Sequence, residues 1–169
     1  RLSMIGSGGY FCDPHDPLSA HQRTITSSGD RILILDHGSQ FTQLIARRVR
    51  ELNVMEIHPF NKAQQFRDDP DIKGVILSGS PFSVHEPNAP DTDITGFQGR
   101  VPVLAVCYGA QLLAKRAGAT VERSKVREYG RAFLDNIHIR EPLFAGIHPG
   151  TQVWMSHGDS ITTHAGDME

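Results

Sequence analysis

Three apolar runs, each closed by small or polar residues, constrain the fold of this chain more than any other feature. They are Ile32–Leu35, Gly74–Ser78 and Val101–Val106, and a mixed run, Val54–His58, follows the first of them. Short runs of this kind are typical of parallel strands that are buried on both faces. The sequence therefore predicts a central sheet with helices packed on either side.

The segment after the first run has the spacing of an amphipathic helix. Its apolar residues recur on one face of the helical period, and they are Phe41, Leu44, Ile45, Val49 and Leu52. Strands that alternate with helices form a mostly parallel, doubly wound α/β sheet of the flavodoxin-like kind. In such folds ligands bind where the carboxyl ends of the strands meet, so we expect the functional residues at that edge.

Both ends of the chain are expected to differ from this pattern. Residues 1–30 show no sustained period and are interpreted as an irregular N-terminal extension or tag. After Gly118 the chain contains short mixed stretches, which predict a small antiparallel extension beside the main sheet: TVERS, GRAFL, NIHIR and QVWMS. Trp154, in the last of these stretches, is expected to anchor the core.

Charge and cysteine content limit the classes of function. The 169-residue chain carries a net charge of −2 and has a pI near 6.5, which argues against a broad nucleic-acid or anionic-membrane surface. No apolar run approaches the ~18 residues of a membrane span. Two cysteines are too few for a disulfide framework and favour a reducing compartment, so we expect a cytoplasmic protein.

Cys107 stands between the predicted strand Val101–Val106 and a helix expected to begin near Ala110. This order is that of a nucleophile elbow, a sharp turn that lifts a side chain clear of the sheet. The small residues Ala105 and Gly109 would let the strand and the helix approach closely, and the helix N-terminus would favour the thiolate. The alternative is a small, buried and unreactive side chain, a common fate of free cysteine.

Around this cysteine the sequence resembles a known family. VCYGAQ is similar to the G-x-C-x-G-x-Q signature of class I (triad) glutamine amidotransferases. Four further segments resemble the amidotransferase domain of GMP synthases, in the same order and over residues 31–161: ILILDHGSQFTQLIARRVREL, GVILSGSP, REYGRA and VWMSHGD.

The resemblance implies a glutaminase that is one half of a glutamine-hydrolysing ligase. A cysteine of this family attacks the side-chain amide of glutamine, releases ammonia and forms a γ-glutamyl thioester that water hydrolyses to glutamate. In a GMP synthase the ammonia aminates XMP to GMP on an ATP-pyrophosphatase synthetase domain, which belongs to the same chain or to a separate subunit. That domain binds ATP and magnesium, whereas the amidotransferase domain needs no cofactor. The resemblance also allows a homodimeric parent.

The family motifs assign roles to individual residues of this chain. Cys107 is implied as the nucleophile, with backbone N–H donors for the oxyanion at Tyr108 and in the SGSP loop, chiefly Ser80 beside Gly79. The glutamine substrate would be held by Gln111, Ser156, His157, Gly158 and Asp159. The chain departs from the family at Ala105 and Ser80, where glycine is usual. Neither change removes a backbone N–H donor.

The base that activates the cysteine is not evident in the sequence. The family uses a histidine oriented by a glutamate, both in a His-Pro-Glu segment that follows SHGD. No His-Pro-Glu occurs here, so residues 31–169 are interpreted as an amidotransferase domain truncated before its His and Glu. His37, at the end of the first predicted strand, would share a sheet edge with Cys107 and is the alternative base. The family's matched position is aromatic or variable, which argues against that role.

Two other functions stay open at this point. The domain could serve a different ammonia acceptor, or it could be a non-catalytic module that binds glutamine or docks on a synthetase. Thiol reactivity separates these in part, since a wholly inert Cys107 would favour the docking module. A metal site is not expected, because the histidines and cysteines lack the spacing of metal ligands.

Overall fold

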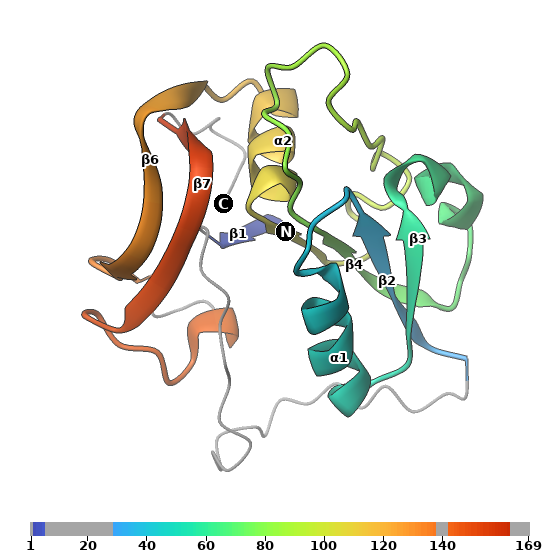
Figure 1. Cartoon of the computed structure of the whole chain (residues 1–169). Helices are drawn as coiled ribbons and strands as arrows, with labels where there is room; N and C mark the ends of the chain where they lie inside the picture. Colours follow the sequence, from blue (N-terminus) through green and yellow to red (C-terminus); the bar gives the residue numbers. More distant parts are fainter. Residues whose placement is uncertain (1, 6–28, 138–141, 163–169) are drawn as a thin grey trace.

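The main layer of the molecule is a five-stranded sheet in which all paired strands are parallel (Figure 1). The structure, a computed structural model, describes residues 2–5, 29–137 and 142–162. In spatial order the strands are β1 (Leu2–Ile5), β5 (Val103–Val106), β4 (Ile72–Leu77), β2 (Arg31–Asp36) and β3 (Met55–Pro59). The predicted doubly wound, mostly parallel sheet is confirmed.

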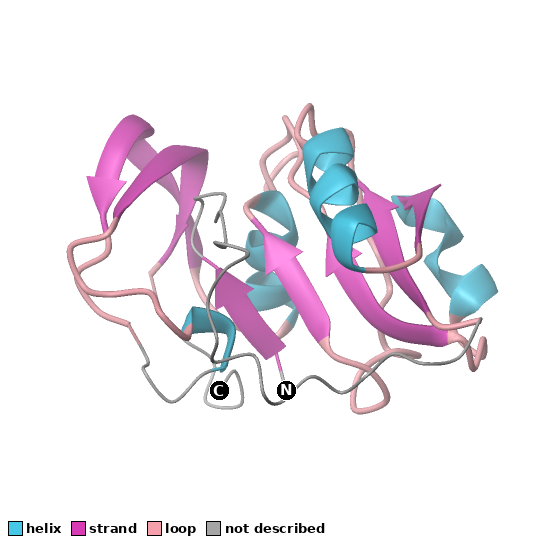
Figure 2. Ribbon diagram, turned by 90° about the horizontal axis from the view of Figure 1, so that it is seen from below, coloured by secondary structure: helices cyan, strands magenta, loops and turns pink. Residues whose placement is uncertain are grey.

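Helices cover both faces of this sheet (Figure 2). Helix α1 (Thr42–Leu52) packs through Ala46 on the face that carries Ile34 and Ile76. Helix α2 (Tyr108–Arg116) and the 3-10 segment η1 (Phe60–Phe66) cover the opposite face, where the buried side chains include Leu33, Leu35, Val75 and Leu77. Successive residues of each strand therefore enter different cores, which explains the uninterrupted apolar runs.

A two-stranded antiparallel ribbon lies beside α2. It consists of β6 (Val121–Phe133) and β7 (Gln152–Ile161), with a register shift between Arg123 and Glu128. The predicted antiparallel extension is confirmed, although two long strands replace the several short ones expected. Of the expected strand NIHIR, Asn136 and Ile137 belong to no strand, and residues 138–140 lie outside the described part of the chain. The short 3-10 segment η2 (Pro142–Phe144) lies in the same connection.

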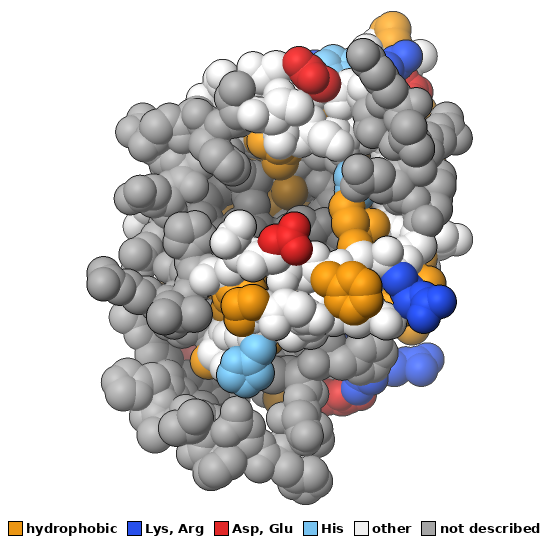
Figure 3. All heavy atoms as spheres, turned by 90° about the vertical axis from the view of Figure 1, so that its left-hand side faces the viewer, with side chains coloured by type: hydrophobic (Ala, Val, Ile, Leu, Met, Phe, Trp, Pro, Cys, Tyr) orange, Lys and Arg blue, Asp and Glu red, His pale blue; other side chains and the backbone are white. Residues whose placement is uncertain are grey.

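The ribbon has a buried face and an exposed face. Along β7 the buried or half-buried positions Val153, Met155 and His157 alternate with the exposed positions Gln152, Trp154 and Ser156. Trp154 is 63% exposed, so the expectation that it anchors the core is wrong. Strand alternation places it on the outer surface, and Figure 3 shows this side of the molecule, where hydrophobic side chains (orange) reach the surface.

Strand β1 is not expected from the sequence pattern. Leu2–Ile5 pairs in parallel with β5, and Ile5 lies opposite Val106 at the end of the pairing that precedes Cys107. Of the other residues of the predicted irregular extension, residues 1 and 6–28 lie outside the described part of the chain, whereas Gly29 and Asp30 belong to it. A four-residue strand carries too little period for a sequence pattern to identify it. Within the described residues, no helix is long and apolar enough to cross a membrane.

Gly109 sets how closely α2 approaches β4. A Cβ atom at this position would lie 2.7 Å from Leu77 Cβ and 2.9 Å from the Leu77 carbonyl oxygen. We predict that Gly109→Ala lowers the free energy of unfolding by about 1–3 kcal/mol, because strand and helix must move apart. Urea denaturation measures this change. Gly158→Ala is the matched control, since a Cβ there meets nothing within 4 Å; equal losses in the two variants would contradict the close approach.

Candidate functional site

Cys107 occupies a strained turn between β5 and α2. Its φ of 52° and ψ of −113° lie in the positive-φ region, and it is the sole non-glycine residue there among residues 2–5, 29–137 and 142–162. A side chain in that region is uncommon and persists only where the surrounding structure imposes it. The predicted elbow is thus present, although α2 begins at Tyr108 rather than near Ala110. The half-buried thiol stands at the carboxyl edge of the sheet.

The loop after β4 lies directly against this cysteine. Gly79 is buried, and a Cβ atom built on it would be 3.5 Å from Cys107 Cβ. Ser80, the next residue, is half-buried, and its hydroxyl accepts a hydrogen bond from the Phe82 N–H at 3.3 Å. The predicted oxyanion residues Gly79, Ser80 and Tyr108 therefore belong to two segments that meet at Cys107.

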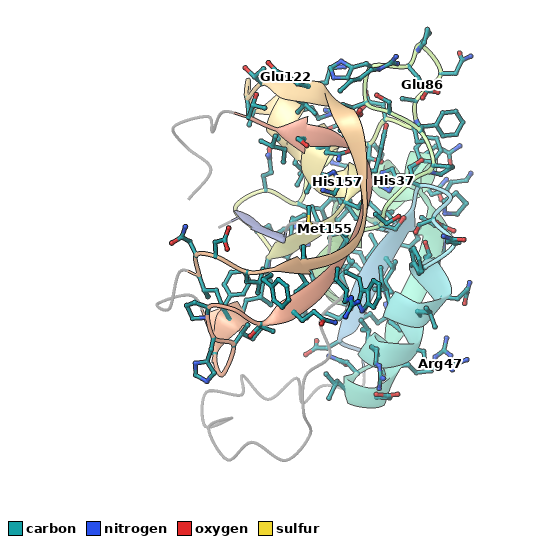
Figure 4. All side chains as sticks on the ribbon, turned by 60° about the vertical axis from the view of Figure 1, so that its left-hand side comes forward. His37, Arg47, Glu86, Glu122, Met155 and His157 are labelled. Atoms are coloured by element: carbon teal, nitrogen blue, oxygen red, sulfur yellow. The ribbon has the colours of Figure 1, made fainter. Side chains whose placement is uncertain are left out.

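Strand β7 forms the opposite side of the site. The Cys107 thiol points to the Ser156 carbonyl oxygen, which accepts its hydrogen at an Sγ to O distance of 3.8 Å. The buried Gln111 side chain donates from Nε2 to the Asp159 carbonyl oxygen at 2.7 Å and so links α2 to β7. His157 is half-buried on the same strand (Figure 4). The Ser156 side chain is exposed, so Ser156 meets the cysteine through its backbone.

Asp159 is buried at 6% exposure and is held by a residue that the sequence motifs did not indicate. The Ser83 hydroxyl donates to Asp159 Oδ2 at 2.6 Å. Ser83 itself is fixed in a turn, since its N–H donates to Glu86 Oε1 at 3.0 Å and its hydroxyl accepts from the His85 N–H at 3.2 Å. Ser83 lies two residues beyond the SGSP loop, and serine in a loop carries no signal of such a contact.

The electrostatic environment holds Cys107 as a thiol. Burial raises the pKa of Cys107, a hydrogen bond from the Tyr108 backbone N–H opposes this rise, and the charge of Asp159 adds to it. The net direction is upward. The N–H donor at the start of α2 lowers the pKa of Cys107, as expected of a helix N-terminus, but burial and the Asp159 carboxylate outweigh it.

His37 does share the carboxyl edge of the sheet, but its environment keeps its imidazole neutral. The ring is 2% exposed, bonds through Nε2 to Thr92 Oγ1 at 2.8 Å, and stacks on Phe60 with ring centroids 5.7 Å apart. Burial lowers the pKa of His37 to about 4. Its other ring neighbour is Tyr108, at a centroid distance of 5.6 Å. His37 thus serves as a core residue behind the elbow, and it is a poor base for Cys107.

Tyr108 contributes its backbone to the site and its ring to the core. Its side chain is 1% exposed, and its hydroxyl donates to the Pro90 carbonyl oxygen. Burial, with smaller contributions from the charges of Asp91 and Glu86, raises the pKa of Tyr108 to about 12. The hydroxyl therefore stays protonated and the ring fixes the first turn of α2.

Comparison with known proteins identifies relatives over most of the chain. The family described as Glutamine amidotransferase class-I matches residues 33–169. A GMP synthase [glutamine-hydrolyzing] from Cytophaga hutchinsonii is 60% identical over 141 residues, which are 83% of this chain and 27% of that protein. Another, from Christiangramia forsetii, is 56% identical over 133 residues, 78% of this chain and 26% of that protein. The chain thus spans about a quarter of the length of these curated relatives.

Two solved structures share the fold. A Thermoplasma acidophilum protein, described as a putative GMP synthase subunit, superimposes with a TM-score of 0.63 at 27% identity, covering 82% of this chain and 69% of that one. A glutamine amidotransferase from Thermotoga maritima gives a TM-score of 0.58 at 20% identity, covering 82% of this chain and 64% of that one.

The neutral burial of His37 makes stability depend on pH. In the unfolded chain the imidazole binds a proton near pH 6.5, whereas in the folded protein it does so only near pH 4. Because the unfolded state binds more protons in this window, we predict that the free energy of unfolding falls as pH drops from about 6.5 to about 4, by up to about 3 kcal/mol.

Urea denaturation across that pH window measures the effect, with His37→Phe as the control that removes the titrating group. The variant should show a shallower dependence on pH than the wild type. Parallel curves for the two proteins would contradict a buried, neutral His37.

Proposed function

Because the chain belongs to the class-I glutamine amidotransferase family, we propose that it is the glutamine-hydrolysing domain of a GMP synthase, with Cys107 as its nucleophile. The observation that carries the proposal is the strained backbone of Cys107 at the junction of β5 and α2. The identity of 60% to a GMP synthase supports the choice within the family. We assign the domain to residues 31–169 and expect it in the cytoplasm.

The proposed reaction starts with attack of the Cys107 sulfur on the side-chain amide carbon of glutamine. The C–S bond forms while the carbonyl π electrons move to oxygen, and the collapse of this intermediate breaks the C–N bond. The leaving nitrogen takes up a proton and departs as ammonia. Water then attacks the γ-glutamyl thioester, which yields glutamate and returns the thiol.

The negative oxygen of the tetrahedral intermediate needs N–H donors at the elbow. We assign these to the backbones of Tyr108 and Ser80, with Gly79 beside Ser80 in the loop that lies against the cysteine. The close contact of Gly79 with Cys107 supports this assignment. Removing one such donor typically costs about 2.7–4 kcal/mol of transition-state stabilisation, so the loop after β4 would matter as much as any side chain.

The substrate pocket is proposed between α2 and β7. We place the α-amino and α-carboxylate groups of glutamine near Gln111, Ser156, His157, Gly158 and Asp159. The buried carboxylate of Asp159 is a suitable partner for an ammonium group, because a buried charge is stable only when paired. Among the described residues Asp159 forms no ion pair.

The base and its acid partner are proposed to come from a segment outside residues 1–169. The sequence has no His-Pro-Glu, and His37 is a weak base because burial lowers its pKa to about 4 and its Nε2 is bonded to Thr92. Ammonia would pass to XMP held on an ATP-pyrophosphatase domain that binds ATP and magnesium. That domain would lie in the part of the relatives that this chain does not span.

We predict that Cys107→Ala abolishes glutamine-dependent ammonia release, by at least about a thousandfold in kcat, because the nucleophile is removed. The measurement is glutamate and ammonia production by the protein that includes the remaining domain. Cys12→Ser is the matched control and should keep full activity. Turnover by Cys107→Ala at the wild-type rate would overturn the nucleophile assignment.

The acceptor has a test of its own. With glutamine, ATP and magnesium present, XMP should be converted to GMP, and Cys107→Ala should make GMP only when ammonia is supplied directly. Glutamine hydrolysis without any amination of XMP would support the assignment as a glutaminase and contradict the assignment to a GMP synthase.

A further inference from the structure

Asp159 and Cys107 lie on two sides of one site, and the negative charge of Asp159 disfavours ionisation of the Cys107 thiol. Asp159 is buried on β7, and its backbone carbonyl is bound by Gln111 on the first turns of α2. Gln111 in turn donates its backbone N–H to the Cys107 carbonyl at 3.1 Å. The backbone of Asp159 is therefore tied to the same helical turn that presents the thiol, and the charge of its carboxylate acts on the sulfur. A negative charge so close disfavours a second negative charge on sulfur.

The hydrogen-bond geometry of Cys107 also favours the protonated form. The thiol donates to the Ser156 carbonyl oxygen, which a thiolate could not do. Ser156 and Asp159 belong to the same strand, so β7 presents to the sulfur an acceptor and an anion. The groups that stabilise a thiolate, the Tyr108 N–H and the N-terminus of α2, come from the other side.

Among the side chains that the structure describes, the other charged and titratable groups around this pair do not neutralise Asp159. Arg123 lies opposite Asp159 in the ribbon register, but it is exposed and forms no ion pair with it among the described residues. Lys115 of α2 donates to the Val84 carbonyl oxygen. Glu86 accepts from the Ser83 N–H. The further described titratable residues on the elbow side and on β7 are His37, Tyr108 and His157.

The Ser83 hydroxyl fixes the direction of the carboxylate. It engages Oδ2 at 2.6 Å, and within the described parts of the chain no hydrogen bond engages the other oxygen, Oδ1. A carboxylate that is buried, held by one oxygen and without a cation has a place for a positive group from outside. An α-ammonium group is such a cation, and every α-amino acid substrate carries one.

We propose that Asp159, oriented by Ser83, couples substrate binding to ionisation of Cys107: the nucleophile stays a thiol in the empty pocket and ionises when an α-ammonium group neutralises the carboxylate. This inference rests on the proposed glutaminase function and deepens it. The S–H bond of Cys107 breaks and its proton passes to the base proposed above or, in a protein of residues 1–169 alone, to solvent water, which reaches the half-buried thiol. Ser83 acts as a positioning residue, since it touches Asp159 rather than the substrate.

Coupling of this kind has a use in an enzyme that releases ammonia. An empty site with a protonated sulfur is protected from alkylation and oxidation, because the thiolate is the reactive form. It also discriminates against amides that lack an α-ammonium group, since these would bind without ionising the nucleophile. By reciprocity, ionised Cys107 would bind the ammonium ligand more tightly.

The test compares two electrophiles on the protein of residues 1–169 carrying Cys12→Ser, a sequence in which Cys107 is the only cysteine left. Iodoacetamide is small and neutral, whereas a chloroketone that carries the α-amino acid group of glutamine brings its own ammonium. The rate of Cys107 alkylation is measured against pH for each, at saturating chloroketone, with mass spectrometry to locate the label. We expect the midpoint of the chloroketone profile to lie about one pH unit below that of iodoacetamide.

Three variants separate the coupling from a general effect on the fold. Asp159→Asn, which keeps the shape of the side chain, should lower the iodoacetamide midpoint by about one pH unit and so raise the rate at neutral pH about tenfold. It should also abolish the difference between the pH midpoints that the two electrophiles give. Ser83→Ala keeps the charge of Asp159 but removes the hydrogen bond that orients its carboxylate, so the difference between the two pH midpoints should become smaller. Glu122→Gln, an exposed carboxylate on the same ribbon, is the matched control and should change neither midpoint.

The outcomes distinguish this inference from the function on which it rests. Selective labelling of Cys107 by the chloroketone with the same midpoint as iodoacetamide would overturn the coupling and leave the glutaminase assignment intact. An iodoacetamide midpoint unchanged in a folded Asp159→Asn protein would also overturn it. If the chloroketone labels Cys107 with no saturation and L-glutamine gives no protection, the glutamine pocket itself is rejected and the coupling with it.

Discussion

The positive-φ backbone at Cys107 is the constraint on which the site depends. A non-glycine residue held there carries strain on the order of 1–3 kcal/mol, so both neighbouring elements must be anchored firmly. Strand β5 is anchored by parallel pairing on both sides, with β1 and with β4. Helix α2 is anchored through Gly109, whose missing side chain lets the helix lie on Leu77 and Ser78. The strain is sustained because neither element can yield alone.

The packing of Gly109 on Leu77 and Ser78 also brings the loop after β4 close to the sulfur of Cys107. The Ser78 N–H pairs with Leu35, and the Ser78 hydroxyl accepts from the His37 N–H at 2.9 Å and donates to the Gly79 carbonyl oxygen at 2.9 Å. The ends of β2 and β4 are therefore bonded to each other just below the loop that contains Gly79. A parallel sheet offers this convergence at its carboxyl edge, and here buried hydrogen bonds make it rigid.

Which features of the fold and the site could be predicted depends on how far apart in the sequence the interacting residues lie. The runs around Leu33, Ile76 and Ala105 indicate buried parallel strands because burial on both faces is a local property of the sequence, and the order of strand, Cys107 and small residue indicates the elbow. The bond between Ser83 and Asp159 joins positions 76 residues apart, and no local pattern encodes it. The prediction for Trp154 is wrong for a similar reason. Its face is fixed by the register of the ribbon, whereas its type alone suggests the core.

The raised pKa of Cys107 shows why neighbouring residues in the sequence are not enough to predict the chemistry of the site. A helix N-terminus stabilises an anion by a partial charge, and on that basis Cys107 would ionise readily. The carboxylate of Asp159 is a full charge in the same buried region. It belongs to β7, whose residue Ser156 contacts the Cys107 thiol although it lies 49 residues later in the sequence. A pocket that must bind an ammonium group needs that carboxylate, and a nucleophile that must ionise is opposed by it. Both requirements are met at the same moment only when the ammonium group is present, so the charge that recognises the substrate is also the charge that restrains the sulfur until the substrate arrives.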